Sequence, residues 1–206
     1  MRLEQELKQN ISAKLPTDDS VSTCRKNLRN LYEDIILEDF KFASMKEVDI
    51  SLWKNIYYKS IELFRKKIKF CAPESKSELF ELFQSFLHEG FGFYFQLIFK
   101  ICVKEKVCIK HFFNRFGMTF PDITEGQASN DAESFVYKLL VFAGDLARYQ
   151  SQYCHDANKN EYNAARWCYL EACRLQPKFG NANNQLAVIE CNLGHQFEGV
   201  YYYYKR

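Results

Sequence analysis

Ala165-Arg-Trp-Cys-Tyr169, in a helix that Pro177 closes, is the stretch that decides the fold. Its small residue and its tyrosine recur 34 residues later as Gly199 and Tyr203. That interval is the period of a repeat made of two helices, in which one pair alone cannot bury its apolar face. The spacing therefore predicts a stack of helix pairs in the last third of the chain.

One insertion explains the only departure from this period. Twelve residues separate Ala187 from Gly199, whereas 21 separate Gly144 from Ala165. The surplus of nine residues falls in the polar stretch 155–163, whose composition suits a lengthened turn between helices. We therefore expect tetratricopeptide-like helix pairs over the last 75 residues, 132–206.

The composition favours an all-α fold with long helices. Hydrophobic residues make up 47% and aromatic residues 17% of the chain, which is typical of a folded interior. Only 8 glycines interrupt the 206 residues, and no segment alternates apolar and polar residues as a half-buried strand would. This length suffices for one domain with a substantial core, so we expect a single helical domain over residues 1–206.

Helical periodicity also predicts long helices before the stacked pairs. The first clear stripe has apolar residues at helical spacing: Leu28, Leu31, Tyr32 and Ile35. The next helix carries Trp53 and ends in the basic run 65–69, where the helix dipole favours cations. Residues 104–131 lose the periodicity and are expected to form a long loop.

The most apolar helix is expected over residues 79–101. Gly90 and Gly92 are costly inside a helix, because glycine loses more backbone entropy than other residues on folding. The expected reason for both is the close approach of another helix.

Charge and apolar patterning exclude several classes of protein. The net charge of +2 gives no global basic excess, so direct contact with nucleic acid is not expected. No run of 18 apolar residues occurs, so no membrane partner is expected. The charged N-terminus lacks the apolar region of a signal peptide, which predicts a cytoplasmic protein and leaves shuttling to the nucleus open.

Metal binding and catalysis have little support. The eight cysteines form no C-x-x-C pair, and reduced, mostly buried thiols are expected. A zinc site from Cys154-His155, Cys191 and His195 would match no usual finger spacing. His88-Glu89 lacks the second histidine of the zinc protease motif, and no nucleophile has an evident histidine partner. We expect no cofactor, no metal and no catalytic residues, and therefore not an enzyme.

Several segments carry a resemblance to a known family. Gly144-Asp-Leu-Ala-Arg-Tyr149, the helix from Trp167 to Pro177, and Gly180-Asn-Ala-Asn-Asn-Gln-Leu-Ala187 together resemble the SMG/Est family. That family comprises the nonsense-mediated mRNA decay adaptors and the ever-shorter-telomere subunit of telomerase. Leu52-Trp-Lys-Asn-Ile-Tyr-Tyr58, with Gly90-Phe-Gly-Phe-Tyr94, is most similar to its SMG-five branch.

The resemblance implies a 14-3-3-like helical domain that binds other proteins. In this family the domain binds phosphorylated partners, chiefly the phosphorylated RNA helicase of the decay pathway. In the SMG-five branch it also pairs with an SMG-seven-type adaptor, so a heterodimer with such an adaptor is expected. Because the repeat pattern stops unfinished, the chain is expected to be a fragment of a longer protein.

The resemblance also implies a phosphopeptide groove lined by Lys59, Arg65, Arg148, Tyr149 and Asn184. Arg148 and Tyr149 match the family's arginine–tyrosine pair, whose guanidinium and hydroxyl would hold a phosphate. An ion pair with Asp145, three residues back, could equally occupy the guanidinium. Asn184 and its two neighbours could hold the peptide backbone or cap the helix that begins there.

The lysine of this groove is displaced in the sequence. Counted from Trp53, its position falls on Tyr58, and Lys59 is rotated from there by roughly 100° in an α-helix. Arg65 stands where 14-3-3 proteins carry a second cation, although a solvated helix end would explain it too. The resemblance therefore implies a groove that is partly dismantled.

Two alternatives stay open. A telomerase-associated Est-type subunit would bind telomerase RNA or telomere proteins, and its basic strip would be Lys100, Lys104, Lys106, Lys110 and Arg115. A tetratricopeptide adaptor outside this family is the other alternative, but the helices before residue 104 show no 34-residue repeat.

Overall fold

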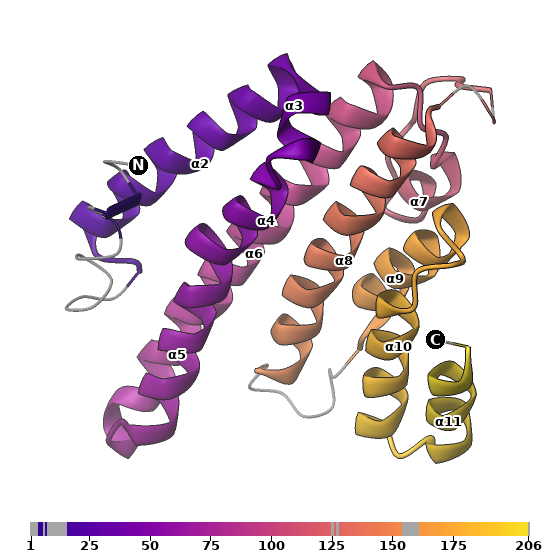
Figure 1. Ribbon diagram of the computed structural model, residues 1–206. Helices are drawn as coiled ribbons and strands as arrows, with labels where there is room; N and C mark the ends of the chain where they lie inside the picture. Colours follow the sequence, from indigo (N-terminus) through magenta and orange to yellow (C-terminus); the bar gives the residue numbers. More distant parts are fainter. Residues whose placement is uncertain are drawn as a thin grey trace. The chain divides into compact units, whose positions relative to one another are not determined.

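Helices make up the regular structure of the chain. The computed structural model describes residues 4, 5, 7, 16–124, 126, 128–153 and 161–205, and no strand occurs within these ranges (Figure 1). The all-α prediction is confirmed. Residue contacts divide the chain into two units, Met1–Leu87 and His88–Arg206, with the boundary inside helix α6 (Pro73–Lys104). A single domain over residues 1–206 stays a prediction.

The second unit contains the stacked helices. In chain order they are α8 (Asn130–Gln152), α9 (Asn163–Leu175), α10 (Asn181–Asn192) and α11 (Gln196–Tyr204). Each helix packs against the next one, and α10 and α11 lie side by side in Figure 1. Most of the predicted lengthened turn, from residue 155 to 160, lies outside the described residues.

The small residues of the repeat lie where two helices approach closely. A Cβ atom added to Gly144 on α8 would lie 2.5 Å from Cε1 of Tyr169 on α9. A Cβ atom on Gly199 of α11 would lie 2.7 Å from Sγ of Cys191 on α10. Both distances are shorter than ordinary van der Waals contact, so a side chain at Gly144 would have to displace the buried Tyr169 ring and one at Gly199 would have to displace Sγ of Cys191.

The predicted loop 104–131 is wrong in part, because it contains the helix α7 (Lys110–Arg115). Phe112 and Phe113 of α7 are buried, and the ring of Phe113 stacks on that of Phe120 at 4.9 Å. Phe95 of α6 meets the Phe113 ring at 5.1 Å. The burial of these aromatic rings stabilises a short helix that the periodicity of the segment does not indicate.

The first unit consists of shorter helices and the first half of α6. They are α2 (Asp19–Glu38), α3 (Phe40–Met45), α4 (Val48–Leu52), the π-helical turn η1 (Trp53–Tyr58) and α5 (Lys59–Phe70). Phe64 of α5 stacks on Phe83 of α6 at 4.9 Å and forms the centre of the core. Leu31 was expected to be buried, but it is exposed, because the buried stripe of α2 runs through Leu28, Tyr32 and Ile36.

The expected close approach at Gly92 is also wrong within the described residues. A Cβ atom added there would meet nothing within 4 Å, and Gly92 is exposed. Because Gly92 has no side chain, the surface of α6 has open space at this position.

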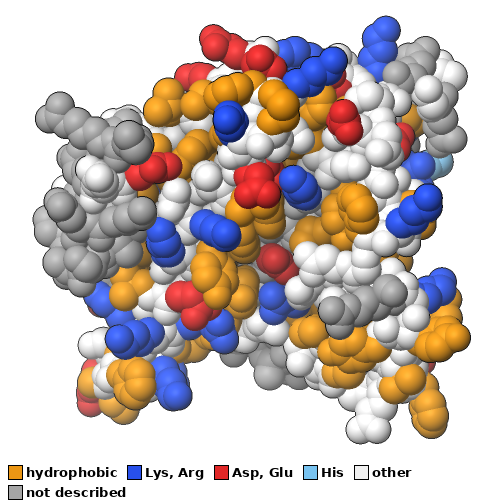
Figure 2. Space-filling view, viewed as in Figure 1, with side chains coloured by type: hydrophobic (Ala, Val, Ile, Leu, Met, Phe, Trp, Pro, Cys, Tyr) orange, Lys and Arg blue, Asp and Glu red, His pale blue; other side chains and the backbone are white. Residues whose placement is uncertain are grey.

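The outer face of α11 is apolar and exposed. Phe197 is 91% exposed and Tyr204 is 90% exposed, and Figure 2 shows hydrophobic side chains gathered over this helix at the lower right. This face has no role in the packing of α11 on α10.

The two helix glycines form a matched pair for a stability test. Gly144→Ala is expected to lower the free energy of unfolding by about 1–3 kcal/mol, because the buried Tyr169 ring cannot move aside. Gly92→Ala is expected to raise it by about 0.5–1 kcal/mol, because alanine is a better helix former and has room. Urea unfolding followed by circular dichroism measures both, and equal effects of the two changes would contradict the packing described.

Candidate functional site

The residues of the predicted phosphopeptide groove are divided between the two units. Lys59 and Arg65 belong to the first unit, whereas Arg148, Tyr149 and Asn184 belong to the second. Their convergence on one phosphate stays a prediction.

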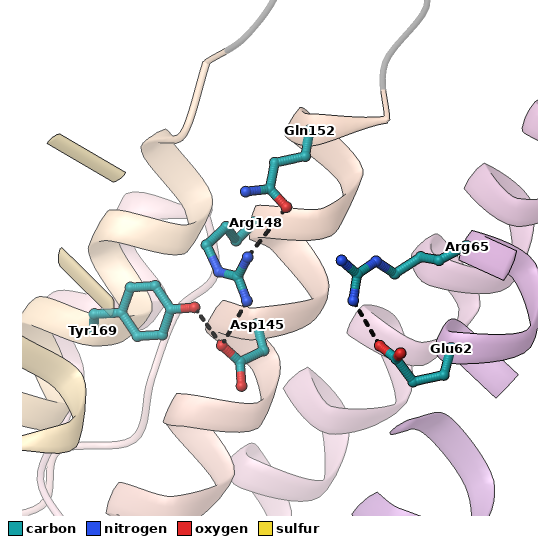
Figure 3. A network of polar contacts seen from close by, with 6 residues as sticks. All are labelled: Glu62, Arg65, Asp145, Arg148, Gln152 and Tyr169. Atoms are coloured by element: carbon teal, nitrogen blue, oxygen red, sulfur yellow. Dashed lines mark hydrogen bonds and ion pairs between the residues drawn. The ribbon is translucent and has the colours of Figure 1, made fainter. Parts of the chain in front are cut away.

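Arg148 is nearly buried and has partners on its own helix. Its guanidinium donates to Oδ1 of Asp145 at 3.4 Å and to Oε1 of Gln152 at 3.1 Å, as Figure 3 shows. It also lies over the Tyr149 ring, 4.5 Å from the centroid. The alternative ion pair with Asp145 is therefore present. Arg148 Nε is buried and makes no hydrogen bond to any residue within the described ranges. Its N–H group is therefore a donor that these residues do not satisfy.

Asp145 connects this arginine to the helix contact at Gly144. The Tyr169 hydroxyl donates to Asp145 Oδ1 at 2.7 Å, the same oxygen that accepts from Arg148. Burial raises the pKa of the Tyr169 hydroxyl well above its ordinary value, so the hydroxyl stays a proton donor at neutral pH. Burial would lower the pKa of Arg148, but Tyr169 and Asp145 beside it raise it, and the guanidinium stays charged. Arg148 is thus held rigidly by α8 and α9.

Arg65 is a contrasting arginine in the first unit. It pairs with Glu62, also three residues back, at 2.6 Å, and both side chains are more than two-fifths exposed. An exposed ion pair of this kind contributes little stability, so Arg65 can leave Glu62 for a ligand at low cost.

Lys59 follows directly after the π-helical turn η1. The Lys59 N–H donates to the carbonyl of Lys54, five residues back, where an α-helix would use the residue four back. Tyr58 and Lys59 are consecutive and both have α-helical dihedral angles, so Lys59 stays rotated from the Tyr58 position by most of the expected 100°. The Lys59 ammonium donates to Oδ1 of Asn55 at 2.8 Å.

A pocket of about 510 Å³ opens beside this turn. Its lining residues are Trp53, Lys54, Asn55, Tyr58 and Lys59. Sequence reasoning missed Lys54 and Asn55 as site residues, since it treated the segment as a regular helix.

Asn184 does not cap α10. The residue at the cap is Gly180, which has no side chain, and the Tyr137 hydroxyl of α8 accepts from the Ala182 N–H of the first turn at 3.1 Å. Asn184 lies inside the helix, and its Oδ1 is buried without a hydrogen bond to a described residue. Its neighbour Asn183 instead donates to the carbonyl of Lys205 at 3.2 Å and joins α10 to α11. The amide oxygen of Asn184 is therefore a hydrogen-bond acceptor without a donor among the described residues.

An apolar groove in the second unit is a separate candidate site. It measures about 410 Å³, and its lining includes Phe91, Gly92, Phe95 and Phe99 of α6, with Phe116 and Met118 after α7. Lys100 and Gln96 complete the lining. The spacing of the three α6 phenylalanines, with an open glycine among them, is the sequence signal that could have found it.

Metal sites and membrane spans are not found among the described residues. No group of three or more His, Cys, Asp or Glu side chains in these ranges is placed to hold a metal ion. Cys154 and His155 of the zinc alternative lie outside the described residues. None of the described helices has the length and apolar character that a membrane span requires.

Comparisons with known proteins identify relatives along most of the chain. The family described as telomerase activating protein Est1 matches residues 47–154, and the Est1 DNA/RNA binding domain matches residues 165–205. The zebrafish telomerase-binding protein EST1A is 28% identical over 90% of this chain. Arabidopsis SMG7, a nonsense-mediated mRNA decay factor, is 29% identical over 86%, and human SMG5, also such a factor, is 28% identical over 74%.

These relatives are much longer proteins. The chain spans 12% of the zebrafish EST1A, 19% of the Arabidopsis SMG7 and 15% of the human SMG5. A solved structure of the C. elegans SMG5–SMG7 complex matches 99% of this chain and 47% of the matched chain, with a TM-score of 0.56 and 20% identity. This likeness shows that the fold is the predicted 14-3-3-like array of helices.

Arg148 and Arg65 each pair with a carboxylate three residues back. Replacing each arginine tests how burial changes the contribution of such an ion pair to stability. Arg148→Gln is expected to lower the free energy of unfolding by about 1–3 kcal/mol, because it leaves the mostly buried Asp145 carboxylate with fewer partners. Arg65→Gln is expected to change it by less than about 0.5 kcal/mol, because its pair is exposed. Urea unfolding of both variants measures the difference, and an Arg148→Gln variant as stable as the parent would refute the structural role of Arg148.

Proposed function

This chain belongs to the Est1 family, and we propose that it is a protein-interaction domain of a nonsense-mediated decay adaptor that pairs with a related SMG7-type adaptor. The family predicted from the sequence is confirmed by the Est1 match, which covers more than half of the chain. The pairing and the domain's partners are the proposal.

The observation that carries the proposal is the apolar groove on α6 and α7. Five large apolar side chains line this hollow, and a protein partner seated there would remove them from water, so the surface favours a protein partner. Gly92 lies in the groove with open space above it, so another helix could approach the α6 backbone closely. Buried aromatic side chains surrounding such a point supply most of the binding energy in protein interfaces.

The relatives support a partner of the same family. A solved structure with a similar fold is that of a complex between SMG5 and SMG7, and both names recur among the curated relatives. A heterodimer of two related helical domains agrees with a groove that accepts a helix. We further propose that the domain has no catalytic activity and works in the cytoplasm, with shuttling to the nucleus as an open possibility.

Phosphopeptide binding is a second part of the proposal. The partner would be the phosphorylated RNA helicase of the decay pathway, and the groove would use Lys59, Arg65, Arg148, Tyr149 and Asn184. Two observations favour it: the Arg148 guanidinium stays charged and lies 4.5 Å from the centroid of the Tyr149 ring, and the Arg65 ion pair is exposed enough to exchange Glu62 for a phosphate.

Nucleic-acid binding is the alternative function, in a telomerase-associated Est-type subunit. The match of residues 165–205 to the Est1 DNA/RNA binding domain favours it. The predicted basic strip is less favourable, because Lys110 pairs with Asp122 at 3.6 Å and Lys100 lines the apolar groove. Binding of RNA that weakens steeply as salt rises would support this alternative.

Gly92 provides the test of the heterodimer. Gly92→Glu is expected to weaken binding to the SMG7-type adaptor of the same organism at least about tenfold, because a charge would be buried in an apolar contact. Gln196→Glu, which adds a charge at an exposed polar residue outside the groove, is the control and should bind like the parent. Isothermal titration calorimetry measures both. Equal affinities of Gly92→Glu and the parent would place the interface elsewhere.

The phosphopeptide part is tested with a phosphoserine peptide from the helicase and its unphosphorylated twin. The parent is expected to bind the phosphorylated form more tightly, and Arg65→Gln to reduce that preference, since its exposed ion pair leaves the fold intact. Fluorescence anisotropy with labelled peptides measures the preference. Equal binding of the two peptides by the parent would refute phosphate recognition.

A further inference from the structure

We infer that the groove between the end of α5 and the first turns of α6 binds an amphipathic helix of a partner protein. An apolar row of that helix fills the groove, an acidic side chain faces Lys67 and a basic one faces Glu78. This is a further protein-binding surface, because its lining shares no residue with the apolar groove of α6 and α7 or with the predicted phosphopeptide groove. The whole lining lies in the first unit.

A short turn between two helices makes this groove. α5 ends at Phe70 and α6 begins at Pro73, and the two helices run side by side from this turn (Figure 1). The groove measures about 400 Å³. Its lining residues recur at helical spacing on each helix, so each set lies on one helix face. They include Lys67, Phe70 and Cys71 at the end of α5, with Glu78, Leu79 and Leu82 of α6.

Apolar side chains make up most of the lining. Leu79 is buried and Leu82 is half-buried, whereas Phe70 is 72% exposed. The Cys71 thiol donates to the carbonyl of Ile68 at 3.4 Å, so its hydrogen bond is already made. The favourable occupant of this part of the groove is therefore an apolar side chain, which removes the Phe70 ring from water.

A helix fits this groove better than an extended peptide. Extended peptides commonly bind by adding a strand to the edge of a sheet. Both walls here are helices, whose backbone N–H and C=O groups are paired within each helix. The side chains of a third helix can instead pack into the groove between two neighbouring helices.

The two walls of the groove carry opposite charges. Lys67 lies on the α5 wall and Glu78 on the α6 wall, and neither side chain forms an ion pair with another residue of the described ranges. Figure 2 shows Lys and Arg side chains beside hydrophobic ones at this end of the first unit, at the lower left. Exposed residues continue both charges along the helices: Lys66 and Lys69 on α5, Glu74 and Glu81 on α6.

These opposite charges select the occupant. RNA or an anionic membrane surface would be repelled by the acidic wall, whereas a helix with one acidic and one basic flank pairs with both walls. Ion pairs at such exposed positions contribute little energy each. The apolar row of the bound helix therefore supplies most of the affinity, and the charged flanks supply the specificity.

Cys71 makes occupancy of the groove measurable, because its thiol is half-exposed and lines the groove. The probes are three designed helical peptides of about 20 residues that share one apolar row. One peptide has an acidic and a basic flank, the second has two acidic flanks and the third has two basic flanks. The mixed peptide is expected to slow iodoacetamide labelling of Cys71, read by mass spectrometry, and each twin to bind about fivefold more weakly. Labelling of the exposed Cys191 in the second unit should not change.

Charge reversal in the groove changes the expected preference. Lys67→Glu makes both walls acidic, so the variant is expected to prefer the peptide with two basic flanks. Glu78→Lys makes both walls basic, so this variant is expected to prefer the peptide with two acidic flanks. Lys41→Glu, an equal charge change at an exposed residue of α3 outside the groove, should keep the preference of the parent. Circular dichroism checks that every variant folds.

Several results would overturn the inference. Unchanged Cys71 labelling with all three peptides would mean that no helix binds in the groove. Equal protection by the three peptides, or the same preference in the parent and in both groove variants, would mean that the charged walls do not select the occupant. Slower labelling at high concentration of the chain alone would assign the groove to a second copy of this chain. Protection of Cys71 by polyuridine RNA would assign it to nucleic acid.

Discussion

Helix α9 can pack on α8 only because Gly144 has no side chain. The Tyr169 ring fills the space that a Cβ atom would need, and its hydroxyl then reaches Asp145 on the same helix as the glycine. Asp145 holds Arg148, so the position of the predicted phosphate ligand depends on a contact between two helices. Helix packing and the placement of Arg148 are therefore coupled in this part of the chain: a change at Gly144 would alter the placement of Arg148 without touching it.

The elements that the sequence predicts well are those whose signal is local and periodic. The recurrence of Ala165 and Tyr169 after 34 residues predicts a second helix pair, and the structure has Gly144 at the contact of α8 with α9 and Gly199 at the contact of α11 with α10. The apolar stripe of α6 is also evident from the helical spacing of its apolar residues. The ion pair between Asp145 and Arg148 could also be foreseen, since residues three apart in a helix are neighbours.

Other features are decided by contacts that a single sequence does not display. Phe112, Phe113 and Phe120 stabilise α7 through ring packing between residues whose spacing shows no helical period. Gly92 and Gly144 are both glycines within helices, yet a Cβ atom at Gly144 would meet a ring and a Cβ atom at Gly92 would meet open space. The π-helical turn is the clearest case, because the choice between a bond to the fourth or the fifth preceding carbonyl depends on packing. The helical periodicity of the sequence likewise does not predict whether the groove residues of the two units converge.

The turn at Trp53–Tyr58 also has a genetic consequence. It holds about one residue more than an α-helical turn of the same height, so loss of a single codon there would restore a regular helix. Such a loss would rotate one part of the helix against the other by about 100° and change which side chains share a face. A ligand site could thus be remodelled by one small deletion, with every other codon of the domain unchanged.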